Sequence, residues 1–302
     1  DTYYKIFDRQ GISYKTTNGK LPLYIEGSLK ADTFEVEGNI SSQFITGLLY
    51  TLPLLDGDSE IVIKGPLESK GYVDLTLKIL EMADIEVKNN DYKSFLIKGN
   101  QTYKGFDYTV EGDYSQVAFW IVAGILSEEI NCKNVYKDSL QGDRAIVEIV
   151  QRMGANLEIN DKNIKVFPGK TKGTVIDVSQ CPDIAPVLTV LAALSEGETR
   201  IINAERLRIK ESDRITSMRT ELNKLGADIR EEGDTLVING VDELEGGVTV
   251  DSWNDHRVAM ALAIASIKCK NPILITDAGA VRKSYPNFWN DFVSMGGKVG
   301  EI

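Results

Sequence analysis

Two kinds of helical pattern and a strand pattern follow one another along this chain, and the succession recurs. Each amphipathic helical segment ends in a similar short sequence motif, called the phrase below. A short segment of alternating hydrophobic and polar residues, typical of a strand, follows it. The phrase is found at Met82–Ile85, Met153–Asn156, Leu225–Ile229 and Met295–Val299, and in short form at Gln10–Ile12. Successive copies lie roughly 70 residues apart, which indicates a repeated fold. The glycine that most copies contain predicts a left-handed residue at the end of the helix.

Each repeat also contains a second, more apolar helix upstream of the amphipathic one. These helices are predicted at Ser42–Leu54, Ser115–Leu126, Asp183–Leu194 and Asp255–Ile267. A short turn and an alternating strand follow, as at Ser59–Lys64 and Thr199–Asn203. Such a repeat cannot bury both helices alone, so several must stack. We therefore predict an α/β (α+β) protein of βαβαββ repeats, with the apolar helices inside and the amphipathic helices outside.

Composition narrows the class of protein. The 302 residues, 42% of them hydrophobic and 26% charged, fit a globular chain of two domains. No apolar run is long enough to span a membrane, and the first residues lack the pattern of a signal peptide, so we expect a cytoplasmic protein. A net charge of −11 disfavours nucleic-acid binding. Three scattered cysteines and one histidine favour neither a disulfide framework nor a metal site, and no cofactor motif is present.

Cations gather at Arg206–Arg214 in spite of this acidic background. The alternation of Arg206, Arg208 and Lys210 predicts the end of a strand with three cations on one face. Ser212-Asp213 then begins an amphipathic helix. Exposed ion pairs are worth only about 0 to 1 kcal/mol, so we favour an anion-binding pocket over a solvated surface.

A second candidate, Asn254–Ala263, begins an apolar helix. Either Asn254 or Asp255 is a plausible N-cap. His256 and Arg257 stand where the helix dipole disfavours positive charge, a placement that a bound anion would offset. For His256, a structural imidazole is an equally good interpretation.

Three further segments have both a structural and a functional interpretation. At Glu37–Phe44, hydroxyls and a carboxamide stand at a helix start, where they either cap the helix or bind a polyol and its phosphate. In Gln180–Pro186, Asp183 opens a helix or acts as a general base towards a hydroxyl. Ala280–Asn287 places two cations in a loop.

Together these residues resemble the 5-enolpyruvylshikimate-3-phosphate (EPSP) synthase family. The resemblance is most specific in the segments Gly38–Phe44, Arg208–Arg214 and Asn254–Met260, and it runs over essentially the whole chain. It implies two similar domains of three βαβαββ repeats each, the inside-out α/β barrels of the enolpyruvyl transferases, closing on substrates bound between them. We place the boundary so that residues 1–111 form the first domain and residues 112–302 a complete three-repeat domain.

The family chain is longer than this one at its N-terminus, and this chain begins without methionine. The first domain is therefore expected to be incomplete and the chain to be inactive or severely impaired. The resemblance implies transfer of the enolpyruvyl group of phosphoenolpyruvate to the 5-hydroxyl of shikimate-3-phosphate, with release of phosphate. It implies no metal or organic cofactor, and we expect a monomer.

The resemblance also assigns roles to single residues. Asp183 corresponds to the base for the 5-hydroxyl, Lys210 lies near that hydroxyl, and Glu211 handles the methylene proton of phosphoenolpyruvate. Shikimate-3-phosphate is expected to contact Ser41, Ser42, Gln43, Ser69, Asp183, Arg206 and Lys210. Phosphoenolpyruvate is expected to contact Gln43, Arg214, His256, Arg257 and Lys283.

Three alternatives stay open at this point. The related transferase that acts on UDP-N-acetylglucosamine shares the fold, although the phrases at Lys210–Arg214 and Asn254–Arg257 favour the shikimate enzyme. A chain that binds shikimate-3-phosphate without catalysis is the second. The RNA 3′-phosphate cyclases, built from similar repeats, are disfavoured by the acidic charge.

Overall fold

The protein is described by a computed structural model covering residues 2–300. The chain divides into two compact units between Thr109 and Val110, close to the boundary expected after residue 111. We call them the N-terminal unit and the C-terminal unit and describe each by itself.

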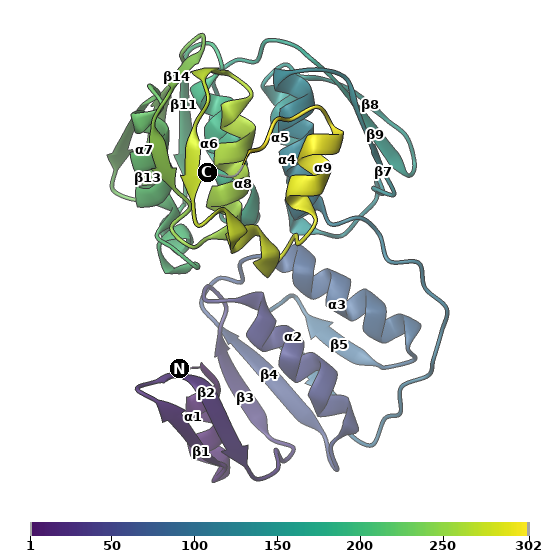
Figure 1. Ribbon diagram of the computed structural model, residues 1–302. Helices are drawn as coiled ribbons and strands as arrows, with labels where there is room; N and C mark the ends of the chain where they lie inside the picture. Colours follow the sequence, from purple (N-terminus) through teal and green to yellow (C-terminus); the bar gives the residue numbers. More distant parts are fainter. Residues whose placement is uncertain (1, 301–302) are drawn as a thin grey trace. The chain divides into compact units, whose positions relative to one another are not determined.

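The N-terminal unit contains one βαβαββ repeat, preceded by a helix and a hairpin. Its elements are α1 (Thr2–Gln10), β1 (Ser13–Thr17), β2 (Lys20–Glu26), β3 (Thr33–Glu37), α2 (Ser42–Thr51), η1 (Leu52–Leu54), β4 (Ser59–Lys64), α3 (Lys70–Met82), β5 (Val87–Asn90) and β6 (Ser94–Ile97). β1 and β2 form a two-stranded antiparallel sheet. The other strands form a sheet in the order β3-β4-β6-β5, in which only β3 and β4 are parallel. The helices α2 and α3 of this repeat lie on one face of that sheet (Figure 1).

Alternation in the strands explains the core of this unit. In β4 the side chains of Ile61 and Ile63 are buried and face Ile45 and Leu49 of α2 in one hydrophobic cluster. Phe95 of β6 completes the same cluster. Burying one such side chain contributes about 1.5 to 3 kcal/mol, so a few of them can hold α2 on the sheet.

The C-terminal unit continues the same succession of elements. They are α4 (Tyr114–Leu126), β7 (Ile130–Lys133), η2 (Gly142–Arg144), α5 (Ala145–Arg152), β8 (Asn156–Ile159), β9 (Asn163–Phe167), β10 (Val175–Asp177), η3 (Pro182–Ile184), α6 (Ala185–Ala193), β11 (Glu198–Ile202), η4 (Glu205–Ile209), α7 (Arg214–Lys224), β12 (Asp228–Glu232), β13 (Thr235–Asn239), β14 (Leu244–Gly246), β15 (Thr249–Asp251), α8 (His256–Ser266), β16 (Cys269–Asn271), β17 (Leu274–Thr276), η5 (Ala278–Lys283) and α9 (Phe288–Ser294).

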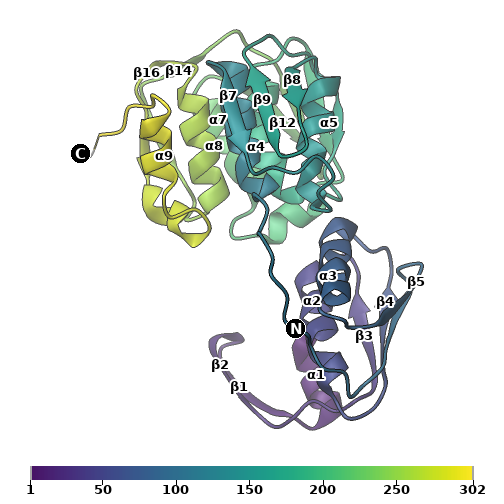
Figure 2. The same cartoon turned by 90° about the vertical axis from the view of Figure 1, so that its right-hand side faces the viewer.

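The apolar helices α4, α6 and α8 form the centre of this unit. They pack against one another and are buried almost all round, whereas α5 and α7 bury only one face. The sheets β7-β9-β8 and β10-β11-β13-β12 lie outside them (Figures 1 and 2). The predicted α/β fold, with apolar helices inside and amphipathic helices outside, is therefore confirmed.

Three details of the repeat differ from the prediction. Within the described residues, the first repeat of the C-terminal unit has three strands in its sheet, with no strand before α4. The last repeat forms two separate pairs, β14 with β16 and β15 with β17. The phrase Met295–Val299 ends α9 but leads into no strand as far as residue 300.

The glycines of the phrase end their helices as predicted. Gly154, Gly226 and Gly296 have φ values of 95°, 100° and 96°. Only glycine adopts such values without steric cost, which explains why the residue recurs at this point of the repeat.

Candidate active site

In the N-terminal unit, the predicted phosphate ligands lie at one edge of the sheet. β3 and β4 are parallel, so the loops after both strands leave from the same edge. The Gly38 amide donates to the Lys64 carbonyl, and the Glu68 amide donates to the Gly38 carbonyl. These two bonds bring together the starts of α2 and α3.

The polar side chains at this edge come from both helix starts. Ser41 caps α2 by accepting a hydrogen bond from the Gln43 amide at 3.3 Å, so the capping interpretation is confirmed for this residue. Ser42 is the first residue of α2, and the Gln43 side chain is exposed. Ser69 is buried and holds the N-cap position of α3 in the left-handed region, with φ at 55°. This edge therefore presents three hydroxyls and a carboxamide.

Gly38 allows the two loops to approach this closely. A Cβ at this position would lie 2.6 Å from the Pro66 carbonyl oxygen and 3.1 Å from the Leu67 Cα, both backbone atoms that cannot turn aside. We expect Gly38→Ala to destabilise the N-terminal unit by about 1 to 3 kcal/mol, as overpacking does, measured by calorimetric unfolding. Gly105→Ala is the control, because nothing lies within 4 Å of its Cβ. Equal melting curves for the two variants would contradict this view of Gly38.

In the C-terminal unit, Arg214 is the centre of a buried ion-pair network. Its side chain is 1% exposed. Its Nε atom lies 2.9 Å from Asp255 Oδ2, Nη1 lies 2.8 Å from Asp183 Oδ1, and Nη2 lies 2.7 Å from Glu211 Oε2. The residues come from different elements: Arg214 begins α7, Asp255 caps α8 and Asp183 lies in η3. One guanidinium thus ties three helix starts together.

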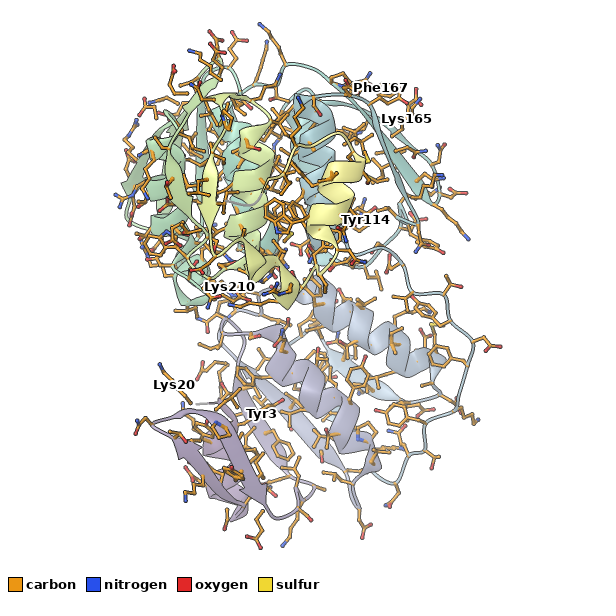
Figure 3. The ribbon with its side chains drawn as sticks, in the orientation of Figure 1. Tyr3, Lys20, Tyr114, Lys165, Phe167 and Lys210 are labelled. Atoms are coloured by element: carbon orange, nitrogen blue, oxygen red, sulfur yellow. The ribbon has the colours of Figure 1, made fainter. Side chains whose placement is uncertain are left out.

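Asp183 is shared by three cations. Besides Arg214, Lys210 Nζ lies 3.3 Å and Arg257 Nε lies 3.5 Å from its Oδ1 atom. Figure 3 shows Lys210 at the lower end of the C-terminal unit in that view. The Asp183 side chain is 26% exposed, so it can be reached from solvent while its neighbour Arg214 cannot.

These charges shift the acidity of the carboxylates. Burial opposes ionisation of Asp183, but the charges of Arg257, Lys210 and Arg214 outweigh it and hold its pKa well below the usual range. Burial likewise opposes ionisation of Asp255, whose pKa is lowered by Arg214 and by the Arg257 amide. Both side chains are therefore ionised at neutral pH.

The lowered pKa values predict acid-sensitive stability. A carboxyl group whose pKa is lower in the folded than in the unfolded chain stabilises the fold above its unfolded pKa, about 3.9 for aspartate, and loses that contribution as the pH falls. We expect the C-terminal unit to lose more stability between about pH 5 and about pH 2 in the unsubstituted chain than in Asp255→Asn. Urea unfolding followed by tryptophan fluorescence measures this, since Trp120, Trp253 and Trp289 all lie in that unit. Equal losses in the two chains would contradict the assignment.

His256 and Lys283 lie at the edges of this network. The His256 side chain is buried, and its Nδ1 lies 3.8 Å from Asp255 Oδ1 and 3.9 Å from Glu211 Oε1, without a hydrogen-bond partner in the structure. Burial and the Arg257 charge lower the pKa of His256, so the imidazole is neutral at neutral pH. Lys283 is exposed and donates to the Asn254 carbonyl.

The structure corrects the expected strand of cations. Residues Glu205–Ile209 form the 3₁₀ helix η4 instead of a strand, so alternate residues do not share a face. Arg208 pairs instead with Asp213, Glu231 and Asp234. Arg206 is buried, with Nη1 3.4 Å from the Ser179 carbonyl oxygen. Lys210, the last of the three predicted cations, does reach Asp183.

Sequence reasoning missed two members of the network. Asp255 does cap α8, as proposed, but it also pairs with Arg214. Ser115, near the start of α4, contacts the guanidinium of Arg257. Both residues stand at the start of an apolar helix, as Asp183 does, so their common place in the repeat is the signal that identifies them.

The described part of the chain offers neither a metal site nor a membrane-spanning helix. Residues 2–300 contain no group of three or more histidine, cysteine, aspartate or glutamate side chains arranged to hold a metal ion. Nor does any helix among them combine the length and the apolar character needed to cross a membrane.

Comparison with known proteins shows a family match over nearly the whole chain. Residues 9–292 match the model of EPSP synthase (3-phosphoshikimate 1-carboxyvinyltransferase). A 3-phosphoshikimate 1-carboxyvinyltransferase of Clostridium novyi is 57% identical over 301 residues, which are 100% of this chain and 69% of the relative. A Clostridium perfringens protein of the same name is 58% identical, over 99% of this chain and 71% of its own length.

Solved structures agree with the fold. EPSP synthase from Acinetobacter baumannii is 25% identical, with a TM-score of 0.79 over 97% of this chain and 69% of the other. The enolpyruvyl transferase NikO from Streptomyces tendae, 18% identical, has a TM-score of 0.79 over 97% of this chain and 70% of its own. At that identity the second match supports the shared fold alone.

Proposed function

The chain belongs to the EPSP synthase family, and on that premise we propose that it transfers the enolpyruvyl group of phosphoenolpyruvate to the 5-hydroxyl of shikimate-3-phosphate and releases phosphate. The observation that carries this proposal is the convergence of Lys210, Arg214 and Arg257 on the partly exposed carboxylate of Asp183. The arrangement combines a proton acceptor with fixed positive charge, as the transfer of a group from an anionic donor requires.

The proton acceptor is Asp183. As the 5-hydroxyl oxygen bonds to C2 of phosphoenolpyruvate, its proton passes to the carboxylate, and the methylene carbon gains a proton to give a tetrahedral adduct. The adduct then loses phosphate and one methyl proton, which restores the double bond. Glu211 is the proposed group for the methylene proton, and Lys210, beside Asp183, lies near the hydroxyl.

The cations bind phosphoenolpyruvate and stabilise charge on the departing phosphate. We assign Arg257 and Lys283 to its anionic groups, with His256 and Gln43 as further contacts. Arg214 was also expected to bind this substrate, and that stays a prediction. Because the side chain is buried and pairs with three carboxylates, we also assign it the structural role of holding Asp183, Glu211 and Asp255 in place.

The hydroxyls of the N-terminal unit are proposed ligands of shikimate-3-phosphate. Ser41, Ser42 and Ser69 offer hydroxyls and Gln43 a carboxamide, groups that suit a sugar-like ring and its phosphate. In the C-terminal unit, Asp183, Lys210 and Arg206 are assigned to the same substrate.

Phosphate release from the two substrates tests the proposal. We expect release with phosphoenolpyruvate and shikimate-3-phosphate together, at the low rate that the sequence predicts for this chain, and none when UDP-N-acetylglucosamine replaces the acceptor. Calorimetric titration with shikimate-3-phosphate is a second readout. It measures the affinity for this acceptor even when turnover is slow. Release only when UDP-N-acetylglucosamine is the acceptor would assign the chain to the transferase that acts on that nucleotide. Binding of shikimate-3-phosphate without phosphate release would make the chain a substrate-binding protein.

We also propose that the chain works in the cytoplasm as a monomer. Its three cysteines are all unbridged, which supports a reducing compartment. Light scattering at several protein concentrations tests the oligomeric state, and a mass that rises with concentration would contradict a monomer.

A further inference from the structure

Arg257 is held by contacts from two sides. On one side its Nε lies 3.5 Å from Asp183 Oδ1. On the other side Nη2 lies 3.1 Å from the Ser115 hydroxyl and Nη1 lies 3.3 Å from the Ser115 carbonyl oxygen. The Ser115 contacts come from α4, a different helix from the α8 that carries Arg257. These contacts fix the guanidinium group at the end of a long and flexible side chain.

The Ser115 hydroxyl has a defined hydrogen-bond direction. Its oxygen lies 2.7 Å from Asp113 Oδ1, and the Ser115 amide donates to the same oxygen at 2.8 Å. The hydroxyl donates its single proton to Asp113. The lone pairs of the hydroxyl are then left for Arg257, which can only donate. In this series of contacts, each hydrogen-bond donor therefore faces an acceptor.

Asp113 is itself fixed. It caps α4, and the Gln141 side chain bonds to the backbone of the residues on either side of it. Gln141 accepts from the Tyr114 amide at 2.8 Å and donates to the Gly112 carbonyl at 2.9 Å. The Ser115 side chain is buried, and Gln141 is buried as well. Water is therefore poorly placed to replace the Ser115 hydroxyl if it is removed.

We propose that Ser115 is a positioning residue for Arg257: its hydroxyl, oriented by Asp113, holds the guanidinium beside Asp183 for binding the anionic group of the donor substrate. This inference rests on the proposed function for the identity of that substrate, phosphoenolpyruvate. Ser115 touches no reacting atom and acts through Arg257 alone.

Three variants separate positioning from stability. Ser115→Ala removes the hydroxyl, and Ser115→Thr keeps it. Ser127→Ala is the matched control, because Ser127 follows the same helix and its hydroxyl binds only the Ala123 carbonyl in the structure. A purely structural role for Ser115 would lower the melting temperature and leave ligand affinity unchanged.

The expected result is a selective loss of anion affinity. Loss of one hydrogen bond to a charged group should weaken binding of phosphoenolpyruvate and of inorganic phosphate about tenfold in Ser115→Ala. Its KM for phosphoenolpyruvate should rise by a similar factor, with kcat changed much less. We expect Ser115→Thr to recover most of the affinity and Ser127→Ala to match the unsubstituted chain. Unchanged affinity in Ser115→Ala would overturn the proposal.

Arginine modification gives a readout that needs no ligand. Phenylglyoxal labelling, located by peptide mass spectrometry, should label Arg257 several times faster in Ser115→Ala, while Arg214, whose guanidinium is held by Asp255, Asp183 and Glu211, keeps its rate. If the unsubstituted chain releases no phosphate from the two substrates, the proposed function fails, but the labelling rates still decide the role of Ser115. Equal labelling of Arg257 in both chains would overturn it.

Discussion

Replacing Arg214 with methionine is expected to lower the free energy of unfolding of the C-terminal unit by about 3 to 5 kcal/mol and to abolish phosphate release. Methionine fills a similar volume but leaves the buried carboxylate of Asp255 and its neighbours Asp183 and Glu211 without their shared cation. An uncompensated buried charge costs more than an ion pair gains. Urea unfolding followed by tryptophan fluorescence measures the loss.

Arg230→Met is the matched control for this prediction. Arg230 also pairs with two carboxylates, Glu198 and Glu232, but its side chain is 48% exposed. Exposed pairs of this kind contribute about 0 to 1 kcal/mol, so the control should remain close to the unsubstituted chain. Arg214→Lys keeps the charge but lacks the planar fork that reaches three directions, and we expect an intermediate stability. Equal losses for Arg214→Met and Arg230→Met would refute the role of burial.

The helices and their order could be predicted from the sequence because the hydrophobic pattern is local. Ser42–Leu54 and Asp255–Ile267 were placed within a few residues of α2 with η1, and of α8. Local pattern failed at Arg206–Lys210, where alternation suggested a strand and the structure has η4. Arg208 has three carboxylate partners that are distant in the sequence or lie beyond the turn, and these favour the compact helical turn over an extended segment.

The network around Arg214 was less predictable for a related reason. The sequence showed cations at Lys210, Arg214 and Arg257 and suggested that a bound anion neutralises them. In the structure, carboxylates of the chain itself do so, and the excess of positive charge at the start of α8 is offset by Asp183 and Asp255. Contacts between residues some 30 to 140 positions apart cannot be read from spacing alone, but the repeat shows which helix starts are equivalent.

This internal neutralisation has a consequence for binding. An anionic substrate that enters the C-terminal unit must share Lys210 and Arg257 with Asp183, because both cations already lie near its Oδ1 atom. If a substrate anion draws these cations away, we expect the pKa of Asp183 to rise and the carboxylate to become a better base. We therefore expect binding of the donor and activation of the proposed base to be coupled through the same two side chains.

Asp183→Asn tests this coupling directly, and we expect it to lower phosphate release by about 10² to 10⁴ fold, the range typical for loss of a general base. Asparagine keeps the size and an acceptor oxygen but cannot take a proton at neutral pH. It also leaves Lys210 and Arg257 without their internal anion, so affinity for inorganic phosphate should stay equal or increase while turnover falls. Phosphate release and calorimetric phosphate binding, measured on the same variant, separate these two effects.

Asp177→Asn is the control for the loss of a nearby carboxylate. Asp177 ends β10 and accepts from the Ser179 amide and from Asn203, but it contacts none of the cations around Asp183 in the structure. Its replacement should change stability slightly and leave the rate of phosphate release within a few fold. If Asp183→Asn lost rate and phosphate affinity in equal measure, the carboxylate would be needed to hold the cations in place, and its assignment as the base would be wrong. A loss of rate alone supports proton transfer, because neutral asparagine still accepts hydrogen bonds from the same cations.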